Sequence, residues 1–251
     1  MALQGNFPLK DSNSTKIYEG NYQYFSEQTM YCEETFEVFR NSDKTVIQFF
    51  SELYTRTGQG MLFTVQVSYF INKSYIPILV NINKQLGKDS CSETYILIEN
   101  TNTLVYEFKN KSTKNNLEIK PPPRFHIAAP TAVQCMTFIQ SKRFDSSDQN
   151  NYSVFHGQKG WTYEAPPEII DIGVERLSGI PKKLKINDFN LKAIPYQIQL
   201  GEENENDGPA KEKSLIDAHV SRHYSIPYLM NEQNGPIIKI KKLKNLLTEE
   251  S

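Results

Sequence analysis

The sequence predicts a mainly β protein, built as one large antiparallel curved sheet or barrel of two similar halves with one short covering helix. Aromatic residues make up 12% of the 251 residues, with 14 Tyr and 14 Phe, and these types are enriched in strands. Met61–Ile71 alternates apolar with mostly polar side chains, which is typical of an antiparallel strand with one buried face. The phrase Ile-Pro-x-Leu occurs twice, at Ile76–Leu79 and Ile226–Leu229, each time between two β-like runs. This repeat is the reason to expect two halves.

We expect residues 17–245 to form a single β domain, with halves at about 17–120 and 146–245 joined by a connection that contains the helix. Residues 1–16 are polar and expected to be flexible, and residues 246–251 form a C-terminal tail. A chain of this length buries roughly three quarters of its surface on folding, so its core needs no disulfide or metal.

In the first half, alternating apolar residues predict a meander of strands joined by polar turns such as Thr57–Gly60. No long crossover of the βαβ kind is present, so a parallel sheet is not expected. The predicted strands are Val46–Tyr54, Met61–Ile71, Thr94–Glu99, Leu104–Phe108 and Leu117–Lys120.

The connection between the halves has a different pattern. Pro121–Pro123 enforces an extended backbone. After Pro130, the residues Ala132, Cys135, Met136 and Ile139 fall at i, i+3, i+4 and i+7, which is one apolar stripe of a helix. We therefore predict a helix over residues 131–142 that covers the concave side of the sheet.

The second half returns to strands, with Gly157–Gly160 as a hairpin turn and residues 201–213 as a charged, exposed loop. Lysines alternate over residues 239–244, a pattern that protects an edge strand from unwanted pairing. The predicted strands are Tyr152–His156, Trp161–Glu164, Ile169–Arg176, Lys183–Ile186 and Ala193–Leu200.

No catalytic or metal-binding motif is evident. His219 and His223 are four residues apart, but on a strand this spacing separates them by about 13 Å, too far to share one ion. Cys32, Cys91 and Cys135 form no CxxC pair, so no zinc site is predicted; the three thiols allow at most one intramolecular disulfide. No GxSxG elbow or phosphate-binding glycine loop is present.

Several single residues remain as candidates. His126 with Cys135 could form a nucleophile pair, although the apolar stripe favours Cys135 as a core residue. Glu33, Glu34 and Glu37 could act as paired carboxylates, although Glu34 faces away from the other two and most of them are expected to be solvated.

The pattern resembles the LolA-like half-barrels of bacterial envelopes and related β-proteins. The resemblance rests on Ile76-Pro77, Ile226-Pro227 and the closing Asn234–Ile237 segment. It implies a concave sheet covered by helices, with an apolar ligand between them, and a role in carrying lipidated or apolar cargo between membranes. It also implies a periplasmic or envelope location if a signal peptide has been removed; otherwise the cytoplasm is expected.

We therefore expect noncatalytic binding or carriage of a lipid or other apolar ligand in the concavity. The lining candidates are Phe63, Val65, Tyr69, Met136 and Trp161. An alternative is an enzyme acting on a small apolar substrate inside the barrel, for which His126, Tyr163 and His219 supply acid–base groups.

A second alternative is an envelope scaffold without a small ligand. The formal net charge of −1 gives no electrostatic reason to expect nucleic acid. No cofactor is predicted. The sequence contains no run of 18 apolar residues, so no transmembrane segment is predicted.

Overall fold

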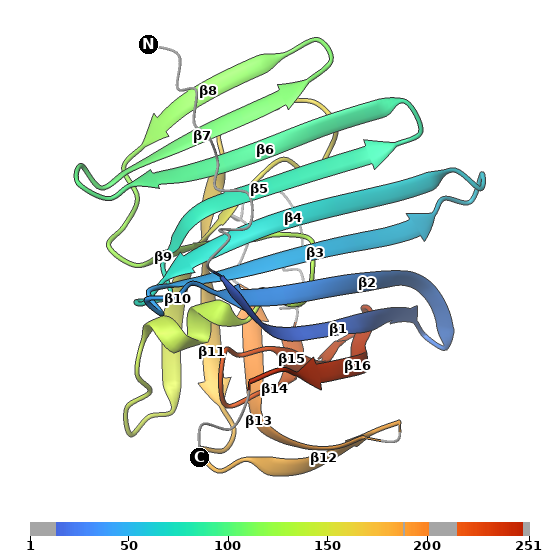
Figure 1. Cartoon of the computed structure of the whole chain (residues 1–251), viewed down its shortest axis with the longest axis vertical. Helices are drawn as coiled ribbons and strands as arrows, with labels where there is room; N and C mark the ends of the chain where they lie inside the picture. Colours follow the sequence, from blue (N-terminus) through green and yellow to red (C-terminus); the bar gives the residue numbers. More distant parts are fainter. Residues whose placement is uncertain (1–13, 188, 201–214, 248–251) are drawn as a thin grey trace, which may run out of the picture.

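The computed structural model describes residues 14–187, 189–200 and 215–247. Its strands form one large sheet in the order β8-β7-β6-β5-β4-β3-β2-β1-β16-β15-β14-β13-β11-β10-β9, with β12 paired to β13 off this path (Figure 1). Neighbouring strands are antiparallel except for the short parallel pair of β9 and β10. The expected mainly β fold is confirmed, as an open sheet with β8 at one end and β9 at the other.

The first eight strands form a meander in which each strand pairs with the one before it. They are β1 (Thr15–Ser26), β2 (Thr29–Arg40), β3 (Val46–Arg56), β4 (Leu62–Asn72), β5 (Pro77–Leu86), β6 (Asp89–Ile98), β7 (Thr103–Asn110) and β8 (Lys114–Ile119).

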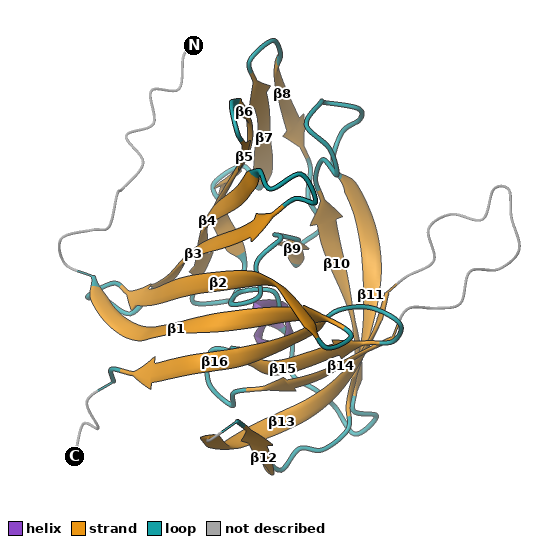
Figure 2. Ribbon diagram, turned by 90° about the vertical axis from the view of Figure 1, so that its right-hand side faces the viewer, coloured by secondary structure: helices purple, strands orange, loops and turns teal. Residues whose placement is uncertain are grey.

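The remaining strands form the other wall, and β16 returns to pair with β1. They are β9 (Phe125–Ile127), β10 (Gln149–His156), β11 (Glu168–Arg176), β12 (Lys182–Ile186), β13 (Phe189–Leu200), β14 (Leu215–Val220), β15 (Pro227–Glu232) and β16 (Ile237–Asn245). Figure 2 shows the two walls curling toward each other around β9 and the short 3₁₀-helix η1 (Thr137–Ser141), drawn in purple.

The core lies on the concave side of the sheet because alternate residues of each strand point there. Val38, Phe49, Tyr69, Val80 and Tyr95 stand opposite one another across β2 to β6, and all five are buried. This row joins five strands into one apolar layer.

The two Ile-Pro units occupy equivalent places in the sheet, each at the start of a strand. Pro77 begins β5 and Pro227 begins β15, positions where proline's missing N–H costs no ladder hydrogen bond. Pro77 lies opposite Ile71 and Pro227 opposite Val220, each beside a register shift. The isoleucine before each proline is buried, with an exposed fraction of 9% for Ile76 and 1% for Ile226.

The predicted α-helix over residues 131–142 is wrong. The structure has turns followed by a 3₁₀-helix, η1 (Thr137–Ser141), with i to i−3 hydrogen bonds such as Cys135 N to Ala132 O. Near the start of this segment, the backbone amides of Ala132 and Val133 donate to the buried side chain of Glu34. We call residues 128–141 the strap. It packs against the concave face, as expected of the covering element.

The predicted strand Trp161–Glu164 and the tight turn at Gly157–Gly160 are also wrong. Residues 157–167 form a loop without strand pairing, which we call the inner loop. The backbone amide of Gln158 donates a hydrogen bond to the buried carboxylate of Glu93 on β6. The carbonyl of Trp161 accepts a hydrogen bond from the side chain of Asn110 on β7. These contacts hold the loop against the concave side and away from a regular hairpin.

Other expectations concern single features. The three cysteines are free. Within the described ranges, no group of His, Cys, Asp and Glu side chains could hold a metal ion, and no helix there has the length and apolarity to cross a membrane. The predicted flexible N-terminal segment lies largely outside the described residues, as do the charged loop at 201–213 and most of the predicted tail.

Candidate functional site

A groove of about 690 Å³ lies between the β12–β13 hairpin and strands β1, β15 and β16. We call it the hairpin groove. Most of its lining side chains are apolar or aromatic, which is the composition of small-molecule sites. They are Tyr18, Ile180, Pro181, Phe189, Leu191, Lys192, Ser221, Arg222, His223, Tyr228, Ile240, Leu243 and Asn245.

The groove is the open end of the concave side. Tyr18 lies on the same face of β1 as the buried Tyr22, four residues along the strand. Opposite them, a register shift in the β1–β16 pair brings both Ile240 and Leu243 of β16 to this face. The strap fills the middle of the concave side, and the groove continues beyond it.

The hairpin supplies an unusually exposed apolar wall. Ile180, which precedes β12, is 77% exposed, the highest value among the large hydrophobic residues described. Phe189 and Leu191 on β13 are half-buried behind it. An apolar chain that covers Ile180 would remove this exposed apolar surface from water, and that burial favours binding.

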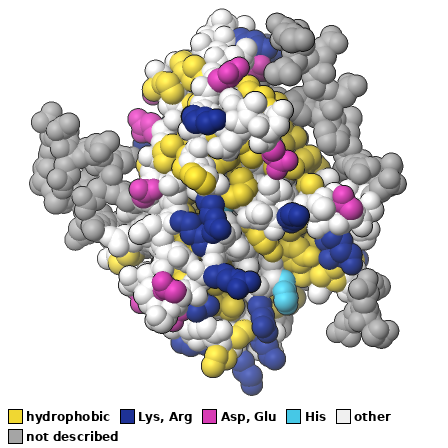
Figure 3. All heavy atoms as spheres, turned by 90° about the vertical axis from the view of Figure 1, so that its left-hand side faces the viewer, with side chains coloured by type: hydrophobic (Ala, Val, Ile, Leu, Met, Phe, Trp, Pro, Cys, Tyr) yellow, Lys and Arg dark blue, Asp and Glu magenta, His cyan; other side chains and the backbone are white. Residues whose placement is uncertain are grey.

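The ionisable groups of the groove, apart from its tyrosines, are basic. Lys192, Arg222 and His223 line it, and none of its described lining residues is acidic. The β14–β15 turn that carries Arg222 and His223 is fixed by Ser221, whose hydroxyl accepts from Ile226 N at 2.9 Å and donates to the carbonyl of His223. Figure 3 shows several Lys and Arg side chains over the lower half of one face of the molecule, toward the end that carries β12 in Figure 1.

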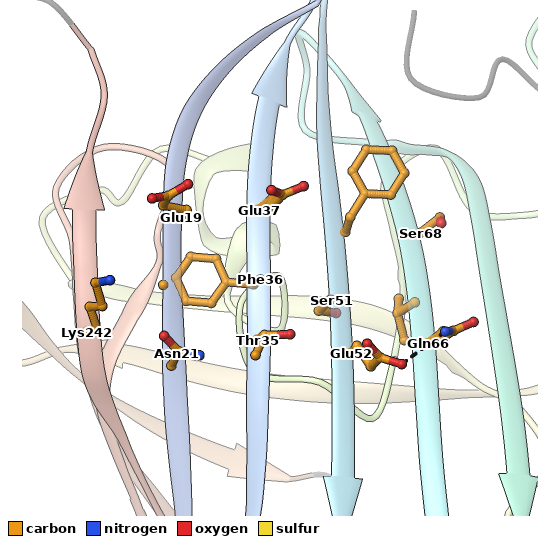
Figure 4. Close-up of a pocket in the computed structure, with 13 residues that line it drawn as sticks. Glu19, Asn21, Thr35, Phe36, Glu37, Ser51, Glu52, Gln66, Ser68 and Lys242 are labelled. Carbon is orange, nitrogen blue, oxygen red and sulfur yellow. Dashed lines mark hydrogen bonds between the residues drawn. The ribbon is translucent and has the colours of Figure 1, made fainter.

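A second hollow, of about 510 Å³, lies on the opposite face of β1 to β4 (Figure 4). Its side chains come in rows set by the strand register, for example Asn21, Thr35, Glu52 and Gln66. Glu52 accepts from Gln66 at 3.0 Å. These groups are mutually hydrogen-bonded or solvated, so the hairpin groove is the better ligand site.

The concave face also holds a carboxyl group in an unusual position. Glu34 of β2 is completely buried. It accepts hydrogen bonds from the Tyr24 hydroxyl, from Ala132 N at 2.7 Å and from Val133 N at 3.2 Å. None of these partners is a cation, and burial raises the pKa of Glu34 to about 7.

Glu93 of β6 is buried in a different way. Its carboxylate forms an ion pair with Lys84 at 3.1 Å and accepts from Tyr106 at 3.1 Å and from Gln158 N at 2.9 Å. Lys84 also donates to the carbonyl of Gln158 at 2.7 Å. This pair anchors the inner loop, just as Glu34 anchors the strap.

The three acid–base candidates lie in separate surroundings. His126 is buried on β9 between Phe138 and Tyr152. Tyr163 belongs to the inner loop and packs on Phe108. His219 is on β14, beside Pro195 of β13 and Leu229 of β15. The structure describes no contact that joins any two of the three.

The five predicted lining residues belong to the core or its border. Val65, Tyr69 and Met136 are buried, and the Tyr69 hydroxyl donates to the carbonyl of Ile127 at 3.1 Å. Phe63 and Trp161 stack edge to face with ring centroids 5.9 Å apart. None of the five lines either hollow.

Sequence reasoning considered Glu34 only within a group of mostly solvated carboxylates and did not consider Glu93, although a signal for the burial of both was present. Glu34 shares its strand face with the apolar residues Phe36 and Val38, and Glu93 shares its face with Cys91 and Tyr95. A carboxylate in an apolar row is a candidate for burial. The hairpin groove had no comparable signal, because its walls come from distant segments.

Comparison with known proteins identifies a similar fold. No family model matches the chain, and no curated protein matches its sequence. The crystal structure of a beta-barrel-like protein of domain of unknown function DUF1849 from Brucella abortus superposes with a TM-score of 0.58 and 12% sequence identity. The match covers 92% of this chain and 98% of that one. At this identity the likeness establishes the fold, and it extends over nearly the whole length of both chains.

Proposed function

We propose that the protein binds one amphipathic ligand, an acyl chain with an anionic head, in the hairpin groove and catalyses no reaction on it. The observation that carries the proposal is Ile180, 77% exposed at the mouth of an apolar groove. The groove volume of about 690 Å³ is within the range of small-molecule sites.

The charges of the groove support an anionic head. Arg222, Lys192 and His223 line the groove together with its apolar residues, and no acidic group is among the described lining residues. A carboxylate or phosphate placed there gains charge-assisted hydrogen bonds from the arginine and lysine.

We keep the noncatalytic binding role that the LolA-like resemblance implies, and we place the ligand at the end of the concave side, beyond the strap. A more specific version of the proposal is that the protein carries such a ligand between membranes.

The test uses three probes with the same chain: oleate, oleoyl lysophosphatidate and oleyl alcohol. Calorimetry and native mass spectrometry should show one molecule of each anionic probe per protein and weaker binding of the alcohol. Ile180→Glu should weaken binding at least tenfold. Leu62→Glu, also at an exposed apolar position (49%), is the matched control and should bind as the wild type does.

A second experiment tests whether basic side chains recognise the anionic head, and it uses the double variant Arg222→Gln and Lys192→Gln. This double variant should lose the preference for the anionic probes over the alcohol. Lys88→Gln, in the exposed β5–β6 turn, should keep it, because strands β2 to β4 separate β5 from β1. If no probe binds, or if Ile180→Glu binds like the wild type, the proposal is wrong.

A further inference from the structure

The strap and the inner loop are anchored to the same face of the sheet by two glutamates in different electrostatic settings. Glu93 has Lys84 as a counter-ion. The partners described for Glu34 are one hydroxyl and two backbone amides, all uncharged. This difference predicts different responses of the two segments to pH.

We propose that the strap is a pH-sensitive latch, which is docked on the concave face while Glu34 is protonated and loosens when Glu34 loses its proton. The inference is independent of the ligand proposed above.

The geometry explains why loss of the proton should act on the strap. The exposed fraction of Glu34 is 0%, so an ionised carboxylate there loses its hydration. Three neutral donors offset only part of that loss, because a buried charge without a counter-ion is strongly disfavoured. Ala132 and Val133 touch the carboxylate directly, so movement of the strap is the direct way to admit water.

Among the described residues, the titratable side chains around Glu34 stay neutral near pH 7. The titratable side chains that face it are Tyr22 and Tyr24 of β1, Cys32 of β2 and Cys135 of the strap. Burial raises the pKa of each, so all four remain neutral. The pKa of Glu34 itself is raised to about 7.

The strap is also joined to the second wall, which limits how far it can move. Gln140 donates to the Ser225 hydroxyl at 2.7 Å, and the Tyr152 hydroxyl donates to the carbonyl of Ile139 at 3.4 Å. We therefore place the opening at residues 131–136, where Glu34 holds the backbone, and not at η1.

Hydrogen exchange with mass spectrometry tests the latch. After correction for the intrinsic pH dependence of exchange, protection of peptides over residues 131–136 should fall by on the order of a hundredfold between pH 5 and pH 8. Peptides over the inner loop should keep their protection, because Glu93 retains Lys84.

Glu34→Gln should abolish the pH dependence of the strap. Glu33→Gln should leave it unchanged, because Glu33 is the neighbouring residue on the opposite face and pairs with Lys241 at 2.9 Å. Equal strap protection at both pH values in the wild type, or the same loss in Glu34→Gln, would overturn the latch.

If Glu34→Gln does not fold, a carboxyl ¹³C titration of the wild type decides the question. The Glu34 signal should titrate near pH 7, together with the loss of strap protection. An ordinary glutamate midpoint would overturn the proposal.

Discussion

The backbone amide of Gln158 donates a hydrogen bond of 2.9 Å to the carboxylate of Glu93, which lies 65 residues earlier in the chain. The contact closes the inner loop onto β6 and leaves almost no space beside it. A Cβ atom on Gly157 would overlap the Glu93 carboxylate and lie 2.5 Å from the Tyr95 hydroxyl. Glycine is therefore required at position 157 by the close approach of the loop to the sheet.

Gly157→Ala should accordingly destabilise the protein by about 1–3 kcal/mol, because the buried carboxylate or the loop must shift. Chemical denaturation measures the loss. Gly160→Ala is the matched control, because its Cβ would meet nothing closer than Glu164 at 3.7 Å. A similar loss in both variants would contradict this explanation.

Lys84→Met should cost about 3–5 kcal/mol of folding free energy, because it leaves the Glu93 carboxylate buried without a counter-ion. The side chains of the pair are 14% and 2% exposed. Lys111→Met, in the exposed pair with Asp89, should have little effect. Adding Glu93→Gln to Lys84→Met should recover part of the loss; a double variant no more stable than Lys84→Met would contradict the electrostatic reason.

His126 should make the fold sensitive to acid. Its Nε2 donates to the Ser141 hydroxyl at 3.1 Å, since that hydroxyl donates to the carbonyl of Phe138. Its Nδ1 is buried without a described partner, so an added proton there has no acceptor. Burial lowers the pKa of His126 from 6.5 to about 3.

A lowered pKa of a base gives stability that is present above pH 6.5 and is lost as the pH falls toward 3. The difference in unfolding free energy between the wild type and His126→Leu should therefore shrink by about 3 kcal/mol from pH 6.5 to pH 4. Urea denaturation at several pH values measures it. His223→Leu, at an exposed position, should show no such change, and a pH-independent difference for His126→Leu would disprove the assignment.

Ile76→Asp and Ile226→Asp should each destabilise the protein by several kcal/mol, because each buries an unpaired charge at the start of a strand. Thermal and chemical denaturation measure the loss. Ile180→Asp is the control, since that side chain is 77% exposed, and its stability should match the wild type. If either buried substitution is tolerated, the two Ile-Pro units do not hold the core as described.

The sequence alone determined most of the strands and the direction in which most of their side chains point. The period of two along Met61–Ile71 is a local property, and it places Val65 and Tyr69 on the buried face whatever covers that face. The prolines at 77 and 227 likewise fix strand starts through their own chemistry.

Only the tertiary structure decided what lies against those faces. The spacing of Ala132, Cys135, Met136 and Ile139 fits an α-helix, but the structure has only a 3₁₀-helix at Thr137–Ser141. The amide of Ala132 donates to Glu34, 98 residues earlier in the chain, a contact that the spacing does not reveal. The hairpin groove depends in the same way on segments far apart in the chain. Periodicity specifies which face of an element is apolar, whereas the partner of that face follows from long-range packing, which no local pattern encodes.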